Sequence, residues 1–183
     1  MLPLPRLLLV LDLDETLLHA SPTPLGREPD MRFEEYFVYK RPMVEAFLAE
    51  AVAMFDVAVW SSADDTYVQD IVRQLAPTIP FAFVWGRSRC TYRHNLELDT
   101  YCWEKQLQKL RKKGYSLDRV LIVDDTSEKS RTNYGNAMHI PPFEGQEEDK
   151  VLAQLLTYLR PFAHVHHVRR VEKRDWLRRL PAG

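Results

Sequence analysis

The sequence has few cysteines, almost no net charge and no long hydrophobic run. Cys90 and Cys102 are its only cysteines and lack CxxC spacing, which argues against a disulfide framework or a zinc site and is typical of reduced cytoplasmic thiols. A formal charge of −1 provides no overall field that would attract nucleic acid or an anionic membrane. The first apolar run, Leu7–Leu11, is too short to span a membrane and is followed at once by Asp12 and Asp14. We therefore expect a soluble, cytoplasmic protein with no membrane partner.

The sequence also lacks internal repeats, low-complexity tracts and an evident linker. A chain of 183 residues has the length of one globular domain, and such a domain buries roughly two-thirds of its unfolded surface. We expect residues 1–183 to form a single domain that carries insertions. The sequence leaves the oligomeric state open, and we favour a monomer.

Four continuous apolar runs have the length of a strand, and each ends at polar residues or prolines. They are Leu7–Leu11, Val57–Trp60, Val120–Val123 and Ala137–Ile140. Such runs are typical of strands buried on both faces, as in a parallel sheet. Stretches with helical periodicity lie between and after them: Pro42–Met54, Asp64–Leu75, Trp103–Lys113 and Val151–Phe162. The alternation predicts an α/β fold, a parallel sheet flanked by helices, in which ligands bind beyond the carboxyl ends of the strands.

Two β-rich segments interrupt this alternation. Residues 21–40 contain three prolines and a glycine before FEEYFVY, which predicts a short loop-and-hairpin flap. Residues 77–102 contain FAFVWG and CTYR, which predict a small β insertion. Because long loops in compact domains are usually functional, we expect both segments to shape the site.

Asp12 and Asp14 lie two residues apart where the first predicted strand ends, so an extended backbone would direct both carboxylates to one side. Neighbouring carboxylates repel each other unless a divalent cation neutralises them or one of them keeps a proton. The pair therefore indicates a metal or acid–base site. The structural alternative is that Asp14 and Glu15 cap and charge the start of a helix.

DLDETLLH resembles the DxDxT motif of haloacid dehalogenase (HAD) phosphatases, in particular the branch of the RNA polymerase II C-terminal-domain phosphatases and NLI-interacting-factor-like proteins. Four further segments resemble, in the same order, the segment after the flap and the second, lysine and acidic fourth motifs of that branch: YKRPMVEAFL, VAVWSSADDTYV, EKQLQKL and LIVDDTSEKS. The resemblance extends from about Leu7 to Phe162. It implies a HAD-like, Rossmannoid α/β fold and a phosphatase.

By position in these motifs, the resemblance implies that Asp12 attacks phosphorus and becomes an aspartyl phosphate. Asp14 would protonate the leaving oxygen and later accept a proton from water, which requires a raised pKa. Thr16 would orient the loop by hydrogen bonding, and Ser61 would bind a phosphoryl oxygen. Lys105 would offset the charge of the phosphate and of Asp12. Outside the motif order, Thr16 and Ser61 would be taken for caps and Lys105 for a solvated side chain.

The resemblance also implies Mg²⁺ as the cofactor, with no organic cofactor. Asp124 would bind the ion together with the Asp12 carboxylate and the Asp14 backbone carbonyl, an all-oxygen set that suits a small, hard cation. Asp125 would support these ligands without contacting the ion, or would bind the ion through a water molecule. The small C-terminal-domain phosphatases commonly have asparagine after the first acid, so Asp125 is a departure that bears on how the metal is held.

Two other functional classes fit parts of the pattern. A phospho-receiver also combines acids, Mg²⁺ and lysine around a phosphorylated aspartate, but its paired acids come first, whereas Asp124 and Asp125 follow the lysine. A catalytically silent binding protein, as in the mitochondrial import relative of this branch, could lose Asp12 or Asp14, yet both are present. We therefore predict an active phosphatase.

The substrate follows less directly. The short flap and insertion predict an open cleft that admits macromolecular ends, and the resemblance favours phosphoserine or phosphothreonine in a protein. A phosphorylated nucleic-acid terminus and a small phosphate ester are the alternatives.

Two features lie outside the motifs. The histidines His164, His166 and His167 fit an ordinary surface segment better than a metal site. The basic tail from Arg169 to Arg179 is read first as solvated surface and second as a contact for an anionic partner.

Overall fold

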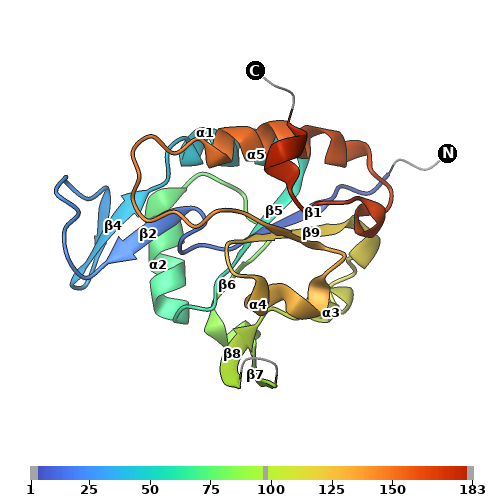
Figure 1. The fold of residues 1–183 in the computed structure, drawn as a ribbon, viewed down its shortest axis with the longest axis horizontal. Helices are drawn as coiled ribbons and strands as arrows, with labels where there is room; N and C mark the ends of the chain where they lie inside the picture. The colour runs from blue at the N-terminus through green and yellow to red at the C-terminus, as the bar shows by residue number, and fades with distance from the viewer. Residues whose placement is uncertain (1–3, 97–98, 181–183) are drawn as a thin grey trace.

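The computed structural model describes residues 4–96 and 99–180, and its centre is a five-stranded sheet in the order β10-β9-β1-β5-β6 (Figure 1). The strands are β1 (Leu8–Leu11), β5 (Asp56–Trp60), β6 (Val84–Trp85), β9 (Val120–Asp124) and β10 (Ala137–His139). All neighbouring strands pair in parallel, so their carboxyl ends lie along one edge of the sheet. The four predicted strands and the α/β class are confirmed.

The register of the strands brings polar residues together at that edge. Leu11, the last residue of β1, pairs with Val59 of β5 and Val123 of β9. One residue further along their strands come Asp12 and Asp124, which therefore lie next to each other at the centre of the edge.

Helices cover both faces of the sheet, which explains why the strand sequences are apolar throughout. One face packs against α1 (Val44–Met54), α2 (Asp65–Leu75) and α5 (Val151–Leu159), and the other packs against the short α3 (Gln108–Arg111). Figure 1 shows α1 and α5 side by side above the sheet and α3 below it. Alternate residues of β1 divide between the two apolar cores. Within the described part of the chain, no helix is long and apolar enough to cross a membrane.

The predicted helix at Trp103–Lys113 is wrong for most of its length. Residues Thr100–Glu104 form β8, which pairs with β7 (Thr91–Asn95) as an antiparallel hairpin, and only α3 is helical. Within the predicted helix, Trp103 packs against its strand partner Tyr92 with 4.7 Å between ring centroids. Such cross-strand aromatic pairs favour the extended chain over a helix that the local pattern alone predicted.

The insertions also differ from their predicted limits. The flap is a three-stranded antiparallel sheet in the order β2-β4-β3, and it begins before residue 21. Its strands are β2 (Leu18–Ser21), β3 (Met31–Phe33) and β4 (Tyr36–Lys40). Within residues 77–102, β6 belongs to the main sheet, so only the β7–β8 hairpin projects from the fold, at the bottom of Figure 1. A strand of two residues has too short a pattern to be separated from a loop by sequence.

Short helices complete the fold. The helix α4 (Ser127–Ser130) follows β9, close to the edge formed by the carboxyl ends of the strands. The predicted last helix ends at Leu159 rather than Phe162 and continues as a 3₁₀ helix, Arg160–His164, which contains Pro161. Residues 168–179, which we call the C-terminal segment, pass along β10, where Trp176 Nε1 donates to His139 O (2.8 Å).

Candidate active site

Asp12 lies directly after β1 and is 1% exposed. Its N–H donates to a carbonyl of β9 (2.9 Å), and Leu13 N–H donates to its Oδ1 (2.9 Å). The chain then turns back at once, with Leu17 N–H bonded to Leu13 O (2.8 Å) and Glu15 in the left-handed region at a φ of 56°. This tight turn fixes the Asp12 carboxylate and keeps Asp14 at the same edge of the sheet.

Lys105 is fully buried between two carboxylates. Its Nζ lies 2.7 Å from Asp12 Oδ1 and 2.6 Å from Asp124 Oδ2. Burial favours a neutral lysine, but the charges of Asp12 and Asp124 outweigh it and raise the pKa of Lys105. The structure places Lys105 in the loop after β8 rather than on a helix, and it brings together the three residues as the order of the motifs predicted.

Lys129 is a second cation at Asp12, and the sequence analysis missed it. Its Nζ lies 3.3 Å from Asp12 Oδ2 and 3.9 Å from Asp125 Oδ1, and its side chain is 22% exposed, whereas Lys105 is inaccessible. Burial would raise the pKa of Asp12, but the charges of Lys105 and Lys129 lower it below the usual range of aspartate. The one available signal was the position of Lys129 in the helix that follows Asp124 and Asp125.

Asp14 faces different groups. Tyr67 Oη donates to Asp14 Oδ1 (2.5 Å), and Ser61 Oγ donates to Asp14 Oδ2 (3.4 Å). Burial raises the pKa of Asp14, the hydrogen bond from Tyr67 opposes that effect, and the charge of Asp12 adds to it, with a raised pKa as the result. Asp14 is therefore suited to hold a proton beside an ionised Asp12. Tyr67, in the first turn of α2, was not among the predicted site residues.

Thr16 does not make the predicted side-chain hydrogen bond, since its buried hydroxyl has no partner among the described residues. The loop is instead held by Arg41, which is fully buried and donates to Thr16 O (3.1 Å) and Pro141 O (3.0 Å). Arg41 also binds both carboxylate oxygens of Asp149, at 2.9 and 2.8 Å. It thereby joins the loops that follow β1 and β10. The sequence analysis placed Arg41 within the segment YKRPMVEAFL but gave it no role.

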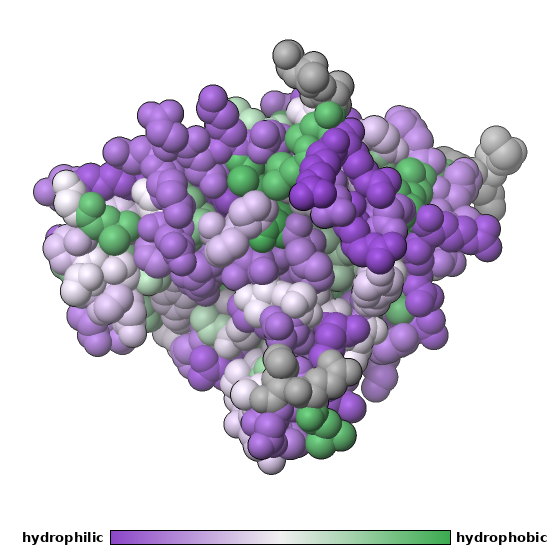
Figure 2. Space-filling model, viewed as in Figure 1, coloured by the Kyte–Doolittle hydropathy of each residue, from purple (hydrophilic) through white to green (hydrophobic). Residues whose placement is uncertain are grey.

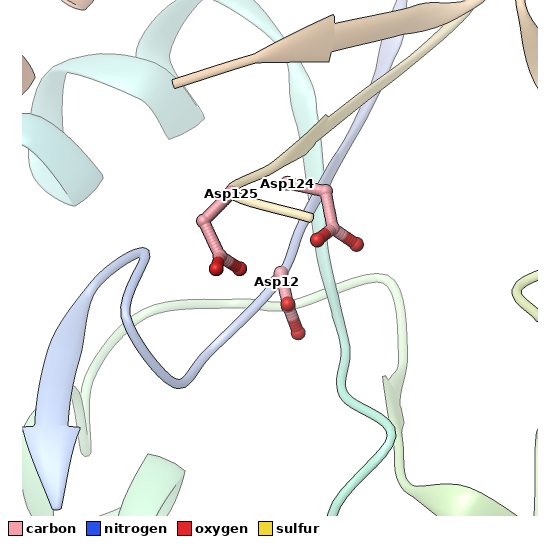
Figure 3. Close-up of side chains that lie close together, drawn as sticks. All are labelled: Asp12, Asp124 and Asp125. Carbon is pink, nitrogen blue, oxygen red and sulfur yellow. The ribbon is translucent and has the colours of Figure 1, made fainter. Parts of the chain in front are cut away.

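Asp12, Asp124 and Asp125 form an acidic cluster in which each residue offers one oxygen, and these three oxygens lie within 4.8 Å of one another. Figure 3 shows their three carboxylates opening to the same side of the strand ends. The buried Oδ1 of Asp125 accepts no hydrogen bond from any described residue. Burial and the charge of Asp12 raise the pKa of Asp124. Three close carboxylate oxygens, one of them without a hydrogen bond, fit a small divalent cation such as Mg²⁺.

A pocket of about 550 Å³ opens beside Asp14, between the flap and α2. Its walls combine aromatic rings with carboxylates: Phe33, Tyr36, Tyr67, Glu34 and Asp64. The space next to Asp14 therefore has aromatic and acidic walls, with no lysine or arginine in its lining.

Comparison with known proteins adds a family match over most of the chain. The family model described as NLI interacting factor-like phosphatase matches residues 7–169. The chain is 31% identical over 173 residues to "CTD small phosphatase-like protein 2" of Dictyostelium discoideum. That match covers 90% of this chain and 29% of the relative, so the chain spans less than a third of the relative's length.

Solved structures share the fold. The fission yeast RNA polymerase II CTD phosphatase Fcp1, bound to beryllium fluoride, superposes with a TM-score of 0.58 at 17% identity over 76% of this chain and 42% of that one. A haloacid dehalogenase-like family hydrolase from Xanthomonas campestris superposes with a TM-score of 0.56 at 11% identity over 87% of this chain and 98% of that one. The predicted HAD-like fold is confirmed.

Proposed function

The chain belongs to the NLI interacting factor-like phosphatase family, and on this basis we propose that it hydrolyses phosphomonoesters through an aspartyl phosphate on Asp12. The observation that carries the proposal is the contrast between Asp12 and Asp14. Two lysines favour the ionised form of Asp12, while burial favours the protonated form of Asp14. A nucleophile and a general acid need that division of roles.

In the proposed first step, Asp12 attacks phosphorus as the bond to the leaving oxygen breaks, and Asp14 gives that oxygen its proton. In the second step, the Asp14 carboxylate takes a proton from the water that attacks the aspartyl phosphate, which releases phosphate and restores Asp12. Lys105 and Lys129 offset the negative charge that gathers at Asp12. Ser61 Oγ, which donates to Asp14 Oδ2 at 3.4 Å, would turn its hydroxyl to a phosphoryl oxygen when substrate binds.

We propose that Asp12, Asp124 and Asp125 hold Mg²⁺, with the Asp14 backbone carbonyl as the further ligand that the family motif implies. When bound, the ion would offset charge on the phosphate and orient it for attack. The support for Mg²⁺ is the all-oxygen donor set and the Asp125 oxygen that accepts no hydrogen bond from a described residue.

For the substrate, we propose phosphoserine or phosphothreonine in a polypeptide. The leaving group departs on the side of Asp14, because Asp14 protonates the leaving oxygen. The pocket on that side combines aromatic walls with Glu34 and Asp64, which suit an uncharged or cationic peptide and repel the phosphodiesters of nucleic acid. A small phosphate ester is the second candidate, because the pocket is large enough to hold one.

We also propose that residues 1–183 act as one domain, as a monomer and in the cytoplasm. All the proposed site residues lie along one edge of a single sheet, so one copy of the chain supplies the complete site. Activity that appears only at concentrations where the chain dimerises would contradict the monomer.

The first test is hydrolysis of p-nitrophenyl phosphate with and without Mg²⁺, by wild type, Asp12→Asn and Asp14→Asn. We expect metal-dependent release by the wild type and loss of turnover in both variants, which change side-chain volume little. Asp118→Asn, at a half-exposed side chain, is the matched control and should retain the wild-type rate. Wild-type rates for Asp12→Asn, or full activity in excess chelator, would overturn the proposal.

A further inference from the structure

The basic C-terminal segment folds around a cavity of about 740 Å³, which we call the C-terminal cavity. It lies beside β10, the strand at one edge of the main sheet. Its lining contains five cationic side chains and only two carboxylates: Arg169, Arg170, Lys173, Arg174 and Arg178 against Glu172 and Asp175. Figure 2 shows strongly hydrophilic surface over much of this segment. The basic tail of the sequence therefore surrounds a space that a ligand could enter.

Three of the arginines are unpaired within the described part of the chain. Arg169, Arg170 and Arg178 are exposed, and none of them forms an ion pair with a described carboxylate. A guanidinium group presents its N–H donors in a planar fork, which fits two oxygens of a phosphate group. An anion in the cavity would therefore meet donors that no described carboxylate occupies.

The other charged groups of the lining do not cancel these arginines. Arg174 Nη2 lies 2.6 Å from Glu172 Oε2, so this pair is neutral as a whole. The buried Lys173 ammonium donates to two backbone carbonyl oxygens, at 2.8 and 2.7 Å, and keeps its charge. Asp175 is the one lining carboxylate that forms no ion pair with a described residue. The cavity is therefore positive, and its field favours an anionic ligand.

The fold fixes both ends of the cavity. At the carboxyl end of β10, Trp176 Nε1 donates to His139 O (2.8 Å). Before its amino end, a Cβ at Gly135 would lie 3.3 Å from Arg169, so the absence of a side chain there lets Arg169 pack closely. Several lining side chains are apolar: Ala137, Pro141, Val171, Trp176 and Leu177. The volume lies within the range of small-molecule sites, roughly 300–1,000 Å³.

The C-terminal cavity is separate from the acidic cluster. Its lining includes none of Asp12, Asp14, Asp124 and Asp125. Arg169 packs against Gly135, before the amino end of β10, whereas the acidic cluster lies at the carboxyl ends of the strands. A phosphate held at Asp12 is therefore not the anion that these arginines would bind.

We propose that the C-terminal cavity is a second binding site, which takes a phosphate group carried on a small apolar body. The phosphate would lie among the unpaired arginines, and the apolar body would pack against side chains such as Val171 and Leu177. Both a soluble phosphate ester and the headgroup region of a lipid have this chemistry. The volume suits such a ligand better than a length of acidic polypeptide. The site is independent of the proposed hydrolysis, because it shares no lining residue with the acidic cluster.

Calorimetric titration of the whole chain with phenylphosphonate, without Mg²⁺, tests this site. Phenylphosphonate carries its phosphorus on an aromatic ring and has no ester to hydrolyse. We expect it to bind the wild type more tightly than inorganic phosphate does, because the ring adds apolar contact. Arg170→Gln/Arg178→Gln should raise the Kd by about tenfold or more, as for the loss of charge-assisted hydrogen bonds.

Two further variants separate the cavity from a general effect of charge. Asp175→Asn removes the unpaired carboxylate of the lining and should lower the Kd. Lys112→Gln/Lys113→Gln removes the same charge as the arginine variant from exposed positions near α3 and should leave the Kd unchanged. An equal Kd in the wild type and the arginine variant would place the anion elsewhere, and an equal rise in the lysine variant would show a general effect of charge. Either result would overturn the site.

The source of the phosphate group is tested with vesicles of phosphatidylcholine, alone and mixed with an equal amount of phosphatidic acid. Binding of phenylphosphonate without binding of the mixed vesicles supports a soluble ligand. Binding of the mixed vesicles that Arg170→Gln/Arg178→Gln abolishes supports a lipid headgroup. If neither probe binds, or if only a polyglutamate peptide binds in a way that depends on the arginines, the cavity is not a phosphate site.

Discussion

Asp12 and Asp14 are two residues apart, yet their carboxyl groups have opposite surroundings. Asp12 receives a backbone N–H and two ammonium groups, whereas Asp14 receives two hydroxyl groups and lies beside the negative charge of Asp12. At Asp12 the cations and the N–H donor stabilise the carboxylate more than burial destabilises it, so its pKa is lowered. At Asp14 burial and the charge of Asp12 outweigh the hydroxyl donors, so its pKa is raised. Their positions just after β1 explain why both residues lie at the edge, but side chains from other segments create the difference between them: Lys105 after β8, Lys129 of α4 and Tyr67 of α2.

Tyr67→Phe should move the alkaline limb of the pH profile to higher pH. The Tyr67 hydroxyl donates to the Asp14 carboxylate, stabilises its charged form and so lowers the pKa of Asp14. Without that bond the pKa of Asp14 rises, and the protonated acid needed for the first step persists to higher pH. The measurement is kcat/KM for p-nitrophenyl phosphate against pH. An alkaline limb that stays in place, or moves down, would contradict the role given to Asp14.

Lys129→Gln should strengthen Mg²⁺ binding. The Lys129 ammonium lies 3.3 Å from Asp12 Oδ2 and 3.9 Å from Asp125 Oδ1, two members of the acidic cluster, so its charge opposes a second cation there. We expect the Kd for Mg²⁺, measured by calorimetry without substrate, to fall by about tenfold, or ~1.4 kcal/mol. Lys112→Gln, which removes an exposed lysine, should leave the Kd unchanged. Equal or weaker binding in Lys129→Gln would show that Lys129 does not compete with the metal.

Sequence reasoning identified the residues whose position in the chain determines their position in space. Asp12 and Asp124 end two adjacent strands, so the parallel register alone brings them together. Lys129, Tyr67 and Arg41 were missed because they reach the site through side chains from other elements. Such contacts depend on how helices and loops pack, which local patterns do not specify.

At the scale of elements, burial on both faces made the main strands predictable. Each central strand is continuously apolar because helices cover both sides of it, and such runs are distinctive in sequence. The β7–β8 hairpin lies outside this sheet and is stabilised by its own cross-strand rings, so the helical periodicity that began at Trp103, near the end of β8, was misleading. The edge strand β6 has two residues and offered almost no pattern.

Arg41 links the loops that follow β1 and β10, and its replacement should destabilise the fold. In Arg41→Met, Asp149 loses its bidentate partner while its side chain is only 10% exposed, and two loop carbonyls lose their donor. Removing one partner of a buried pair costs about 3–5 kcal/mol in unfolding free energy. The matched control Arg160→Met breaks a half-exposed pair with Glu50 and should cost less than about 1 kcal/mol. Similar losses for both variants in urea unfolding would show that Arg41 is not a buried link.

For the whole molecule, a formal charge of −1 conceals an uneven distribution. Carboxylates gather at the pocket beside Asp14, and arginines of the C-terminal segment gather around a separate cavity beside β10. Composition gave no indication of this separation, because the fold brings residues from the flap and α2 to one side and the C-terminal segment to the other. Net charge therefore describes the chain as a whole and does not describe the local field at either of these two surfaces.

Binding of Mg²⁺ at the acidic cluster should also stabilise the whole molecule without any substrate. A ligand that binds only the folded state at a hundredfold excess over its Kd adds about 2.7 kcal/mol of stability. At roughly 2–4 °C per kcal/mol for a chain of this size, the wild-type Tm should rise by about 5–10 °C. Asp124→Asn removes one carboxylate of the cluster and should lose that rise, whatever its own starting Tm.

The comparison is between Tm values with Mg²⁺ and with chelator for each variant, so a lower starting Tm in Asp124→Asn does not affect it. That precaution matters because Asp124→Asn also leaves the buried Lys105 with one carboxylate instead of two. Asp118→Asn, away from the cluster, should show the full wild-type rise. An equal rise in Asp124→Asn would place the stabilising ion elsewhere on the chain, and no rise in the wild type would remove the metal from the proposed chemistry.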